Sequence, residues 1–184
     1  MTYYGGKEMA AAFRTVRANT IQIAEEIPEN KYDFRAAPDT RSVGQTLTHL
    51  AVSPGFQLHM QTNGVTDMKT LNFPALLQQF GAEEAKPRTK AEIIAFLRSE
   101  GDKFASYLEG LSEAFLTEQV TMPPGATPAT KTRFEMLLGP KEHEMHHRGQ
   151  LMLVQRMLGL VPHLTRLMQQ RMAQAQAAAA QGQP

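Results

Sequence analysis

The chain has 184 residues, of which 42% are hydrophobic and 20% are charged, and its formal net charge is +1. This length suits one domain with a sizeable core, and the balanced charge provides no overall field that would hold DNA or an anionic membrane. Because the sequence contains no cysteine, any metal ion must be held by histidine and carboxylate side chains. We therefore expect no nucleic-acid partner and no disulfide.

The N-terminal segment lacks the continuous apolar core of a signal peptide. No uninterrupted apolar run reaches the roughly 18 residues that a membrane span requires. We expect a cytoplasmic protein with no membrane partner.

Two amphipathic helices are expected in the first third of the chain. Apolar residues recur at three- and four-residue steps over residues 7–27, and Pro28 ends this pattern. Ser42 and Gln45 have the spacing of a capping box, which predicts a second helix from about Ser42. That helix is apolar around much of its circumference, so we expect it to be central to the packing.

A long connection follows the second helix. Pro54 is expected to kink this helix or to begin a new turn, because proline removes a backbone donor and clashes with the preceding turn. Residues 63–88 contain scattered glycine and proline and predict one short helix over residues 74–80. A crossover of this length can join helices that are not antiparallel neighbours.

Two further helices and an extension complete the chain. Thr89 and Glu92 form a second capping-box pattern, which predicts a third helix that extends to Leu111. Residues 121–130 read as a loop, and residues 132–158 predict a fourth helix, bent near Pro140. No segment shows the alternation expected of a strand.

These elements predict an all-α fold, a four-helix bundle with a long crossover between helices 2 and 3 and a C-terminal helical extension. We assign residues 1–162 to the bundle and residues 163–184 to the extension. The Ala/Gln-rich end of the extension has little apolar surface, so it is expected to fray or to pack on a second subunit.

Three of the six histidines, His143, His146 and His147, lie within one and a half turns of the fourth helix. His143 and His147 fall on its apolar stripe, which places both imidazoles in the core. Side chains four residues apart can reach one ion at about 2.0–2.1 Å. We prefer metal binding to the alternative, histidines bonded to backbone or side chains at the edge of the core. His49, on the second helix, is the natural third ligand.

Residues 143–147 also spell His-Glu-x-x-His, the signature of zincin metalloproteases. However, no acidic residue follows Glu144, so the downstream carboxylate ligand is missing. Gln150 and Leu153 stand where a metzincin requires Gly and His. Since the chain also predicts no sheet beside this helix, we reject the protease interpretation.

The segment 143–151, His-Glu-Met-His-His-Arg-Gly-Gln-Leu, resembles the signature of the DinB-like (DinB/YfiT) superfamily, and residues 37–50 resemble that family's loop and second-helix start. The resemblance implies a four-helix bundle, commonly dimeric, with zinc or nickel held by three histidines. The implied ligands are His49, His143 and His147, and His146 is not assigned. Similar members include thiol S-transferases that use bacillithiol or glutathione, and a mycothiol-dependent isomerase. The family's damage-inducible name is no evidence of DNA binding.

Two classes of function stay open at this point. The first is a metal-dependent enzyme, since three histidines leave a position on zinc for a water or a thiol that loses its proton there. With no protein cysteine, S-transfer from a small external thiol is the more concrete reaction, and metal-hydroxide hydrolysis is the other. The second class is a non-catalytic metal-binding bundle that acts through protein–protein contacts of its C-terminal segment.

Other polar residues receive weaker assignments. Glu144 is a candidate acid or base, although it lies about 100° around the helix from His143. Gln150 lies nearer the ligand face and is a candidate for orienting a small-molecule substrate. His59 and His163 are expected to be ordinary surface or loop residues.

The chain has more apolar surface than four helices need. The second helix is apolar on more than one side, and the segment after Pro162 adds a stripe with Leu164, Leu167, Met168 and Met172. Exposed apolar patches usually mark interfaces, and two-fold dimers are the commonest homo-oligomers. We therefore predict a homodimer.

Overall fold

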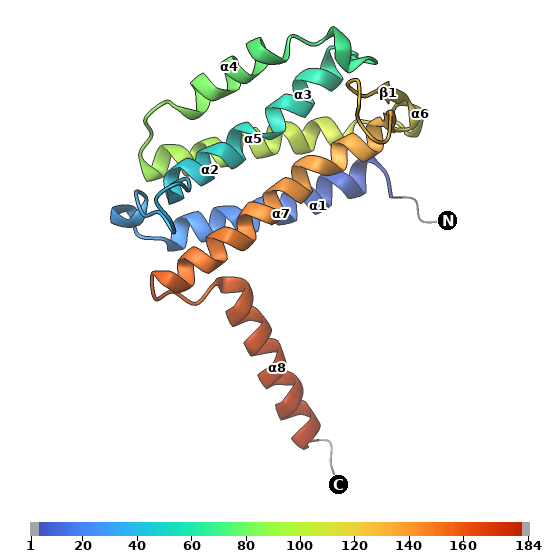
Figure 1. The fold of residues 1–184 in the computed structure, drawn as a ribbon. Helices are drawn as coiled ribbons and strands as arrows, with labels where there is room; N and C mark the ends of the chain where they lie inside the picture. Colours follow the sequence, from blue (N-terminus) through green and yellow to red (C-terminus); the bar gives the residue numbers. More distant parts are fainter. Residues whose placement is uncertain (1–3, 182–184) are drawn as a thin grey trace.

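The computed structural model describes residues 4–181 and has the all-α four-helix bundle fold that the sequence predicts (Figure 1). Four rods lie side by side, and the second of them is divided in two. They are α1 (Gly6–Glu26), α2 (Val43–Val52) with α3 (Pro54–Thr62), α5 (Lys90–Glu109) and α7 (Arg133–Met157). Among these residues, no helix is both long enough and apolar enough to cross a membrane.

Helix starts follow the local signals in the sequence. Both predicted capping boxes form, with Ser42 accepting from the Gln45 backbone N–H and Thr89 accepting from the Glu92 backbone N–H. Pro54 occupies the first turn of α3 and separates it from α2, since proline fits there without loss of a hydrogen bond. The second rod is therefore divided at Pro54, where the sequence predicts a kink or a new turn.

The crossover between α3 and α5 contains a longer helix than predicted. After the short 3-10 turn Met68–Thr70, helix α4 extends over Phe73–Glu84, beyond the expected residues 74–80. It contacts α2 and α3 and buries Leu76. Gly81 does not end α4, because tertiary packing outweighs a helix-propensity cost of about 1 kcal/mol.

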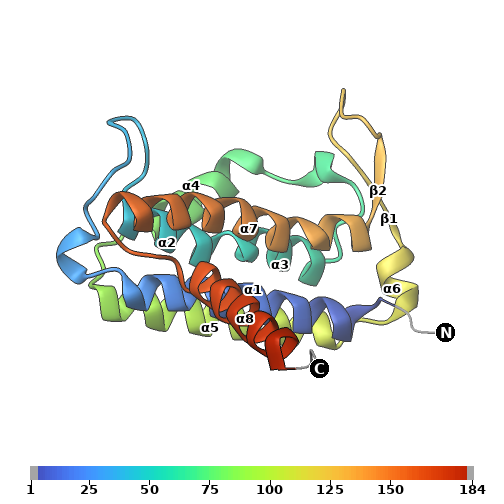
Figure 2. The ribbon, with the colours of Figure 1, turned by 90° about the horizontal axis from the view of Figure 1, so that it is seen from below.

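The expectation that the chain contains no strand is wrong. Strands β1 (Gln119–Thr121) and β2 (Thr130–Thr132) form an antiparallel hairpin, with Val120 opposite Lys131. Three residues are too few for a period-two pattern to be recognised. The helix α6 (Glu113–Thr117) was also missed, because its five residues are too few to show a helical period. Figure 2 shows the hairpin at one end of the bundle and the loop before α2 at the other.

Residues at the interfaces between the rods form the core. Leu47 and Leu50 of α2, Leu97 of α5 and Leu151 of α7 are almost fully buried. Helix α2 buries seven of its ten residues, as expected for an element that is apolar on several sides. This packing fixes α2 beside α7.

Helix α8 (His163–Gln181) projects from the bundle (Figure 1), and residues 182–184 of the predicted extension lie outside the described residues. The prediction that His163 is an ordinary surface or loop residue is wrong. Its side chain is buried, and its Nε2 contacts Asn19 Oδ1 at 3.1 Å. The first turn of α8 is thereby attached to α1.

Candidate metal centre

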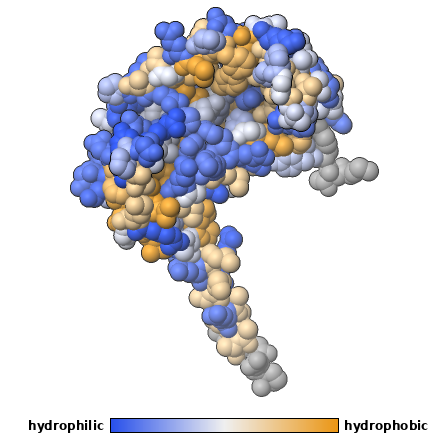
Figure 3. Space-filling view, viewed as in Figure 1, coloured by the Kyte–Doolittle hydropathy of each residue, from blue (hydrophilic) through white to orange (hydrophobic). Residues whose placement is uncertain are grey.

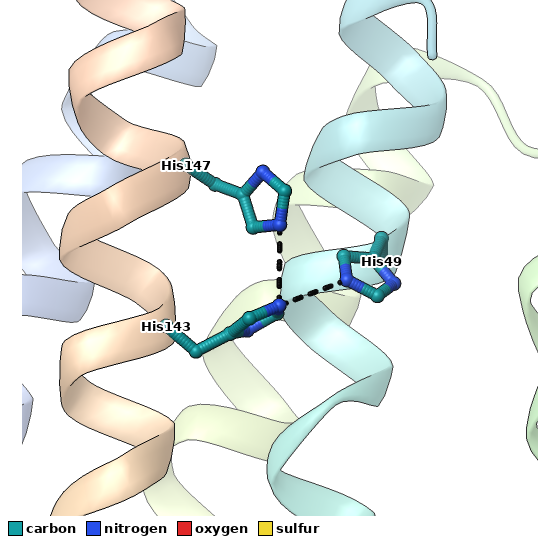
Figure 4. Close-up of side chains that lie close together, drawn as sticks. All are labelled: His49, His143 and His147. Carbon is teal, nitrogen blue, oxygen red and sulfur yellow. Dashed lines mark hydrogen bonds between the residues drawn. The ribbon is translucent and has the colours of Figure 1, made fainter. Parts of the chain in front are cut away.

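The structure brings together the three histidines that the sequence singled out (Figure 4). His49 extends from α2, and His143 and His147 extend from consecutive turns of α7. The Nε2 atom of His143 lies 3.0 Å from His49 Nε2 and 3.1 Å from His147 Nε2. Two ligands at about 2.0–2.1 Å from one tetrahedral ion would be about 3.3–3.4 Å apart. The spacing of these nitrogens therefore suits one small divalent ion.

Two side chains orient the outer histidines. Glu84 of α4 lies with Oε1 2.7 Å from His49 Nδ1, and Gln150 lies with Oε1 2.7 Å from His147 Nδ1. Both oxygens are acceptors, so each imidazole donates its Nδ1–H and keeps a lone pair on Nε2. Partners of this kind commonly fix the tautomer of a metal-binding histidine.

The three imidazoles carry too few N–H groups to make a hydrogen bond at each of their nitrogen–nitrogen contacts. His49 and His147 each place their single N–H on Nδ1, so both present a bare Nε2 to His143. If His143 carries its proton on Nε2, it can donate to only one of them. If it carries the proton on Nδ1, that atom is buried and has no partner. At least one short nitrogen–nitrogen contact thus lacks a hydrogen, and a bound cation would relieve this arrangement.

Burial also keeps the α7 histidines neutral. Desolvation, with the nearby imidazoles and Arg41, lowers the pKa of His143 to about 4. The pKa of His147 is also lowered, mainly by burial, although its hydrogen bond to Gln150 acts in the opposite direction. Neutral imidazole is the form that binds metal ions. Both side chains therefore stay available as ligands at neutral pH.

The sequence placed His143 and His147 in the core, but both are only half-buried. The fully buried polar residue on this part of α7 is Glu144. It shares a helix face with the buried residues Leu137, Pro140 and Leu151, at spacings of three, four and seven. This face packs against the other helices, whereas the histidines line its edge.

Glu144 is consequently unsuited to the acid or base role suggested for it. Both of its carboxylate oxygens accept from Arg17 of α1 at 2.9–3.0 Å, and both side chains are almost fully buried. Sequence reasoning missed this pair. The available signal was Arg17 itself, a charged residue within the buried stripe that includes Phe13 and Thr20.

Arg17 also joins the two helices that carry the histidines. Its guanidinium donates to the carbonyl oxygen of Leu50, which follows His49, and to Glu144, which follows His143. A third bond reaches the carbonyl of Leu97 on α5. Gly101 makes room for this side chain, because a Cβ there would lie 2.8 Å from Arg17 Cγ. One buried cation thus ties α1, α2, α5 and α7 together beside the cluster.

The remaining predicted residues lie near or outside the cluster. Gln150 contacts His147, so it supports a candidate ligand. His146 is exposed and contacts Gln150 at 3.1 Å, and His59 is half-buried on α3 away from the three histidines. Glu84 had no signal in the sequence, because the crossover position of α4 decides its approach to His49.

Comparison with known proteins gives a family-level match. The family model described as the DinB superfamily matches residues 12–151, a range that contains all three histidines. Among curated proteins, the chain is similar to the uncharacterized protein YjoA of Bacillus subtilis (strain 168). The two are 22% identical over 152 residues, which cover 83% of this chain and 90% of that protein.

Solved structures show the same fold. The crystal structure of YjoA superposes with a TM-score of 0.62 at 20% identity, covering 83% of this chain and 92% of that one. YfiT from Bacillus subtilis gives 0.64 at 16% identity, covering 87% and 91%, and is described as a probable metal-dependent hydrolase with an unusual four-helix bundle topology. A DinB-like protein from Bacillus cereus gives 0.63 at 15% identity, covering 84% and 93%.

Proposed function

The chain belongs to the DinB superfamily. Because at least one of the short contacts between its three histidines has no hydrogen to share, we propose that the chain is a metal-dependent enzyme. The proposed ligands of its divalent ion are His49, His143 and His147. The observation that carries this proposal is the meeting of three Nε2 atoms within 4.8 Å of one another. Zinc or nickel suits such a set of nitrogen donors.

Residues of this chain orient the histidines and keep them in the form that binds a metal ion. Glu84 and Gln150 hold the Nε2 atoms of His49 and His147 toward the centre, and burial holds His143 neutral. A bound divalent ion would supply Lewis-acid activation of a small nucleophile at neutral pH. Glu144 is bound to Arg17, and the carboxylate that contacts the cluster is that of Glu84, at His49 Nδ1.

We propose that the activated nucleophile comes from outside the protein, as a water or a low-molecular-weight thiol. The absence of cysteine supports an external thiol, which would make the chain a small-thiol S-transferase. The description of YfiT as a probable metal-dependent hydrolase supports water and hydrolysis. Substrate turnover with and without an added thiol distinguishes these two reactions.

The alternative is a non-catalytic metal-binding bundle that acts through protein contacts. Structural zinc is usually held by four protein ligands, whereas catalytic zinc keeps an open position. In the described residues, the grouping able to hold a metal contains three side chains. This donor count favours the catalytic form.

Metal analysis of purified variants tests the proposal. Wild-type protein should contain about one divalent ion per chain, and His49→Ala or His143→Ala should lose it, since two imidazoles hold zinc poorly. His146→Ala is the matched control, because it removes an exposed histidine from the same helix and should keep the metal. Wild-type protein without stoichiometric metal, or unchanged content in His143→Ala, would contradict the assignment.

We also propose that the chain forms a homodimer. The described surface exposes large apolar side chains at the end of α7, in the following turn and along α8, and Figure 3 shows α8 standing clear of the bundle. These residues are Leu153, Met157, Val161, Leu167, Met168 and Met172. Contiguous exposed apolar surface usually marks an interface.

Light scattering at micromolar concentration should report about twice the chain mass of 20.4 kDa. Removal of residues 163–184 should shift the population toward monomer if α8 forms the interface. A monomeric full-length chain would contradict the dimer, and a dimer that survives the truncation would place the interface elsewhere.

A further inference from the structure

Two cavities of different chemical character meet at the three-histidine cluster. The first has a volume of about 310 Å³ and lies between α2, α3, α4 and α7, with His49 and His143 in its wall. The second has a volume of about 620 Å³ and lies between the loop before α2 and the second half of α7, with His147 in its wall. The three nitrogens therefore stand between two spaces large enough for parts of a small molecule.

The first cavity is apolar away from its histidine end. Its wall includes the side chains of Phe56, Phe80 and Pro140, and Leu77 lies at the rim with 67% of its surface exposed. The other uncharged polar side chains in this wall are Ser53 and Gln57. The hydroxyl of Ser53 donates to a backbone carbonyl, and the amide oxygen of Gln57 accepts from Gln61.

The charged group in the first cavity is equally committed. The carboxylate of Glu84 contacts His49 Nδ1 at 2.7 Å. Apart from the amide N–H groups of Gln57, a charged or strongly polar ligand group would find few partners here to replace its hydration. An aryl or alkyl group fits the wall best.

The second cavity contains a cation with a weak partner. Arg41 is the one arginine or lysine in the walls of these two cavities, and 49% of its side chain is exposed. Its nearest carboxylate oxygen, on Glu84, lies 4.0 Å away, at the limit of an ion pair. Guanidinium binds carboxylates through paired hydrogen bonds. Because Asp39 also lines this cavity, a single negative charge suits it better than a phosphate.

We propose that the site takes a bipartite ligand, with an apolar group in the first cavity, a carboxylate at Arg41 in the second, and the reacting polar atoms between them at the histidines. This inference rests on the proposed function and names its substrate class: small carboxylates that carry an aryl or alkyl group on the other side of the reacting atoms.

One glycine of α7 offers a way to fill the first cavity, and a second offers a control. Gly139 lies in the cavity wall, and Gly149 is exposed outside both cavities. A Cβ added at either position meets no atom of another element within 4 Å, although at Gly139 it also faces the ring of the following Pro140. Gly139→Leu should occupy the apolar space, and its helix content is compared with that of the wild type because leucine before proline strains the helix. Gly149→Leu is the control for a leucine at an exposed glycine of the same helix.

The test measures binding by calorimetry for three probes, on zinc-loaded and on metal-free full-length protein. Phenylacetylglycine has the phenyl group, the amide and the carboxylate, N-methylphenylacetamide lacks the carboxylate, and N-acetylglycine lacks the phenyl group. The complete probe should bind at least tenfold more tightly than either partial probe, because it uses both cavities.

The variants separate the two contributions. Gly139→Leu should remove the advantage of the phenyl group, and Arg41→Gln should remove the advantage of the carboxylate. Gly149→Leu should bind as wild type does, and so should Arg14→Gln, which removes an arginine of similar exposure from α1.

Metal content is measured on every preparation, so the two proposals fail separately. Protein without stoichiometric metal overturns the proposed function, while the probe series on that protein still reports on the cavities. Metal-loaded protein that binds the three probes equally, or Gly139→Leu and Arg41→Gln variants that bind like their controls, would overturn the bipartite site.

Discussion

Helix α7 contributes to two polar clusters on different faces, and they differ in how completely their atoms are paired. On the inward face, Glu144 and Arg17 satisfy one another and two backbone carbonyls. At the edge, His143 contacts two bare imidazole nitrogens, and its own Nδ1 is buried without a partner. A fully paired buried cluster satisfies its own polar atoms, whereas the three histidines form a group that could hold a metal ion.

The largest expected difference between the clusters appears when one member is removed. In metal-free protein, Glu144→Ala should lower the free energy of unfolding by about 3–5 kcal/mol, because it leaves the Arg17 guanidinium buried without its counter-ion. His143→Ala should change it by less than about 1 kcal/mol, since it removes a poorly paired side chain at the edge of the core. Urea denaturation of the two variants measures both values.

A double variant keeps this comparison interpretable if Glu144→Ala fails to fold. Replacing both partners, as Arg17→Met with Glu144→Leu, removes the two charges together and should recover much of the loss. Equal destabilisation by Glu144→Ala and His143→Ala would show that the two clusters do not differ in the way described.

The features that could be predicted from the sequence are those that depend on interactions between residues close together in the chain. Ser42, Thr89 and Pro54 act through local hydrogen bonds and backbone geometry, so the helix boundaries that they set were visible in the sequence. His143 and His147 are four residues apart on one helix, and this spacing alone brings them together. Local rules determine all of these features.

The residues that were missed depend on contacts between distant segments. Arg17 and Glu144 are separated by 127 positions, and Glu84 reaches His49 only because α4 folds back over α2. A wheel drawn for α7 alone could not show that Glu144 faces a guanidinium. The three-residue strands of the hairpin carry too little pattern to be recognised without their partner.

The orienting role of Glu84 provides a second, smaller test. Glu84→Gln should weaken metal binding by about 10- to 100-fold while the bundle stays folded, because an amide holds the Nδ1–H of His49 less firmly than a carboxylate. Competition with a chromogenic chelator measures the affinity. Glu83→Gln is the matched control, because the carboxylate of Glu83 is next to Glu84 in the chain but binds Lys86 and Arg88 instead of His49. Equal affinities for the two variants would exclude an orienting role for Glu84.

The smallest expected effect is a dependence of stability on pH that originates in the histidine cluster. Burial and the neighbouring imidazoles lower the pKa of His143 from the usual 6.5 to about 4 in the folded chain. Between these values the unfolded chain binds a proton that the folded chain does not, so metal-free protein should lose stability as the pH falls from 6.5 toward 4. His147, whose pKa is also lowered, adds to the effect in the same direction.

Because His143 is only half-buried, solvent screening reduces its contribution to about 1 kcal/mol between pH 7 and pH 5. Urea denaturation of metal-stripped wild type and His143→Gln at both pH values measures this contribution together with the coupling of His143 to its neighbouring imidazoles. The wild type should lose about 1 kcal/mol more than the variant on acidification. Equal losses would mean that the imidazole of His143 titrates normally in the folded chain. The description of this cluster as three neutral imidazoles in contact, in contrast to the charged Arg17–Glu144 pair, would then be wrong.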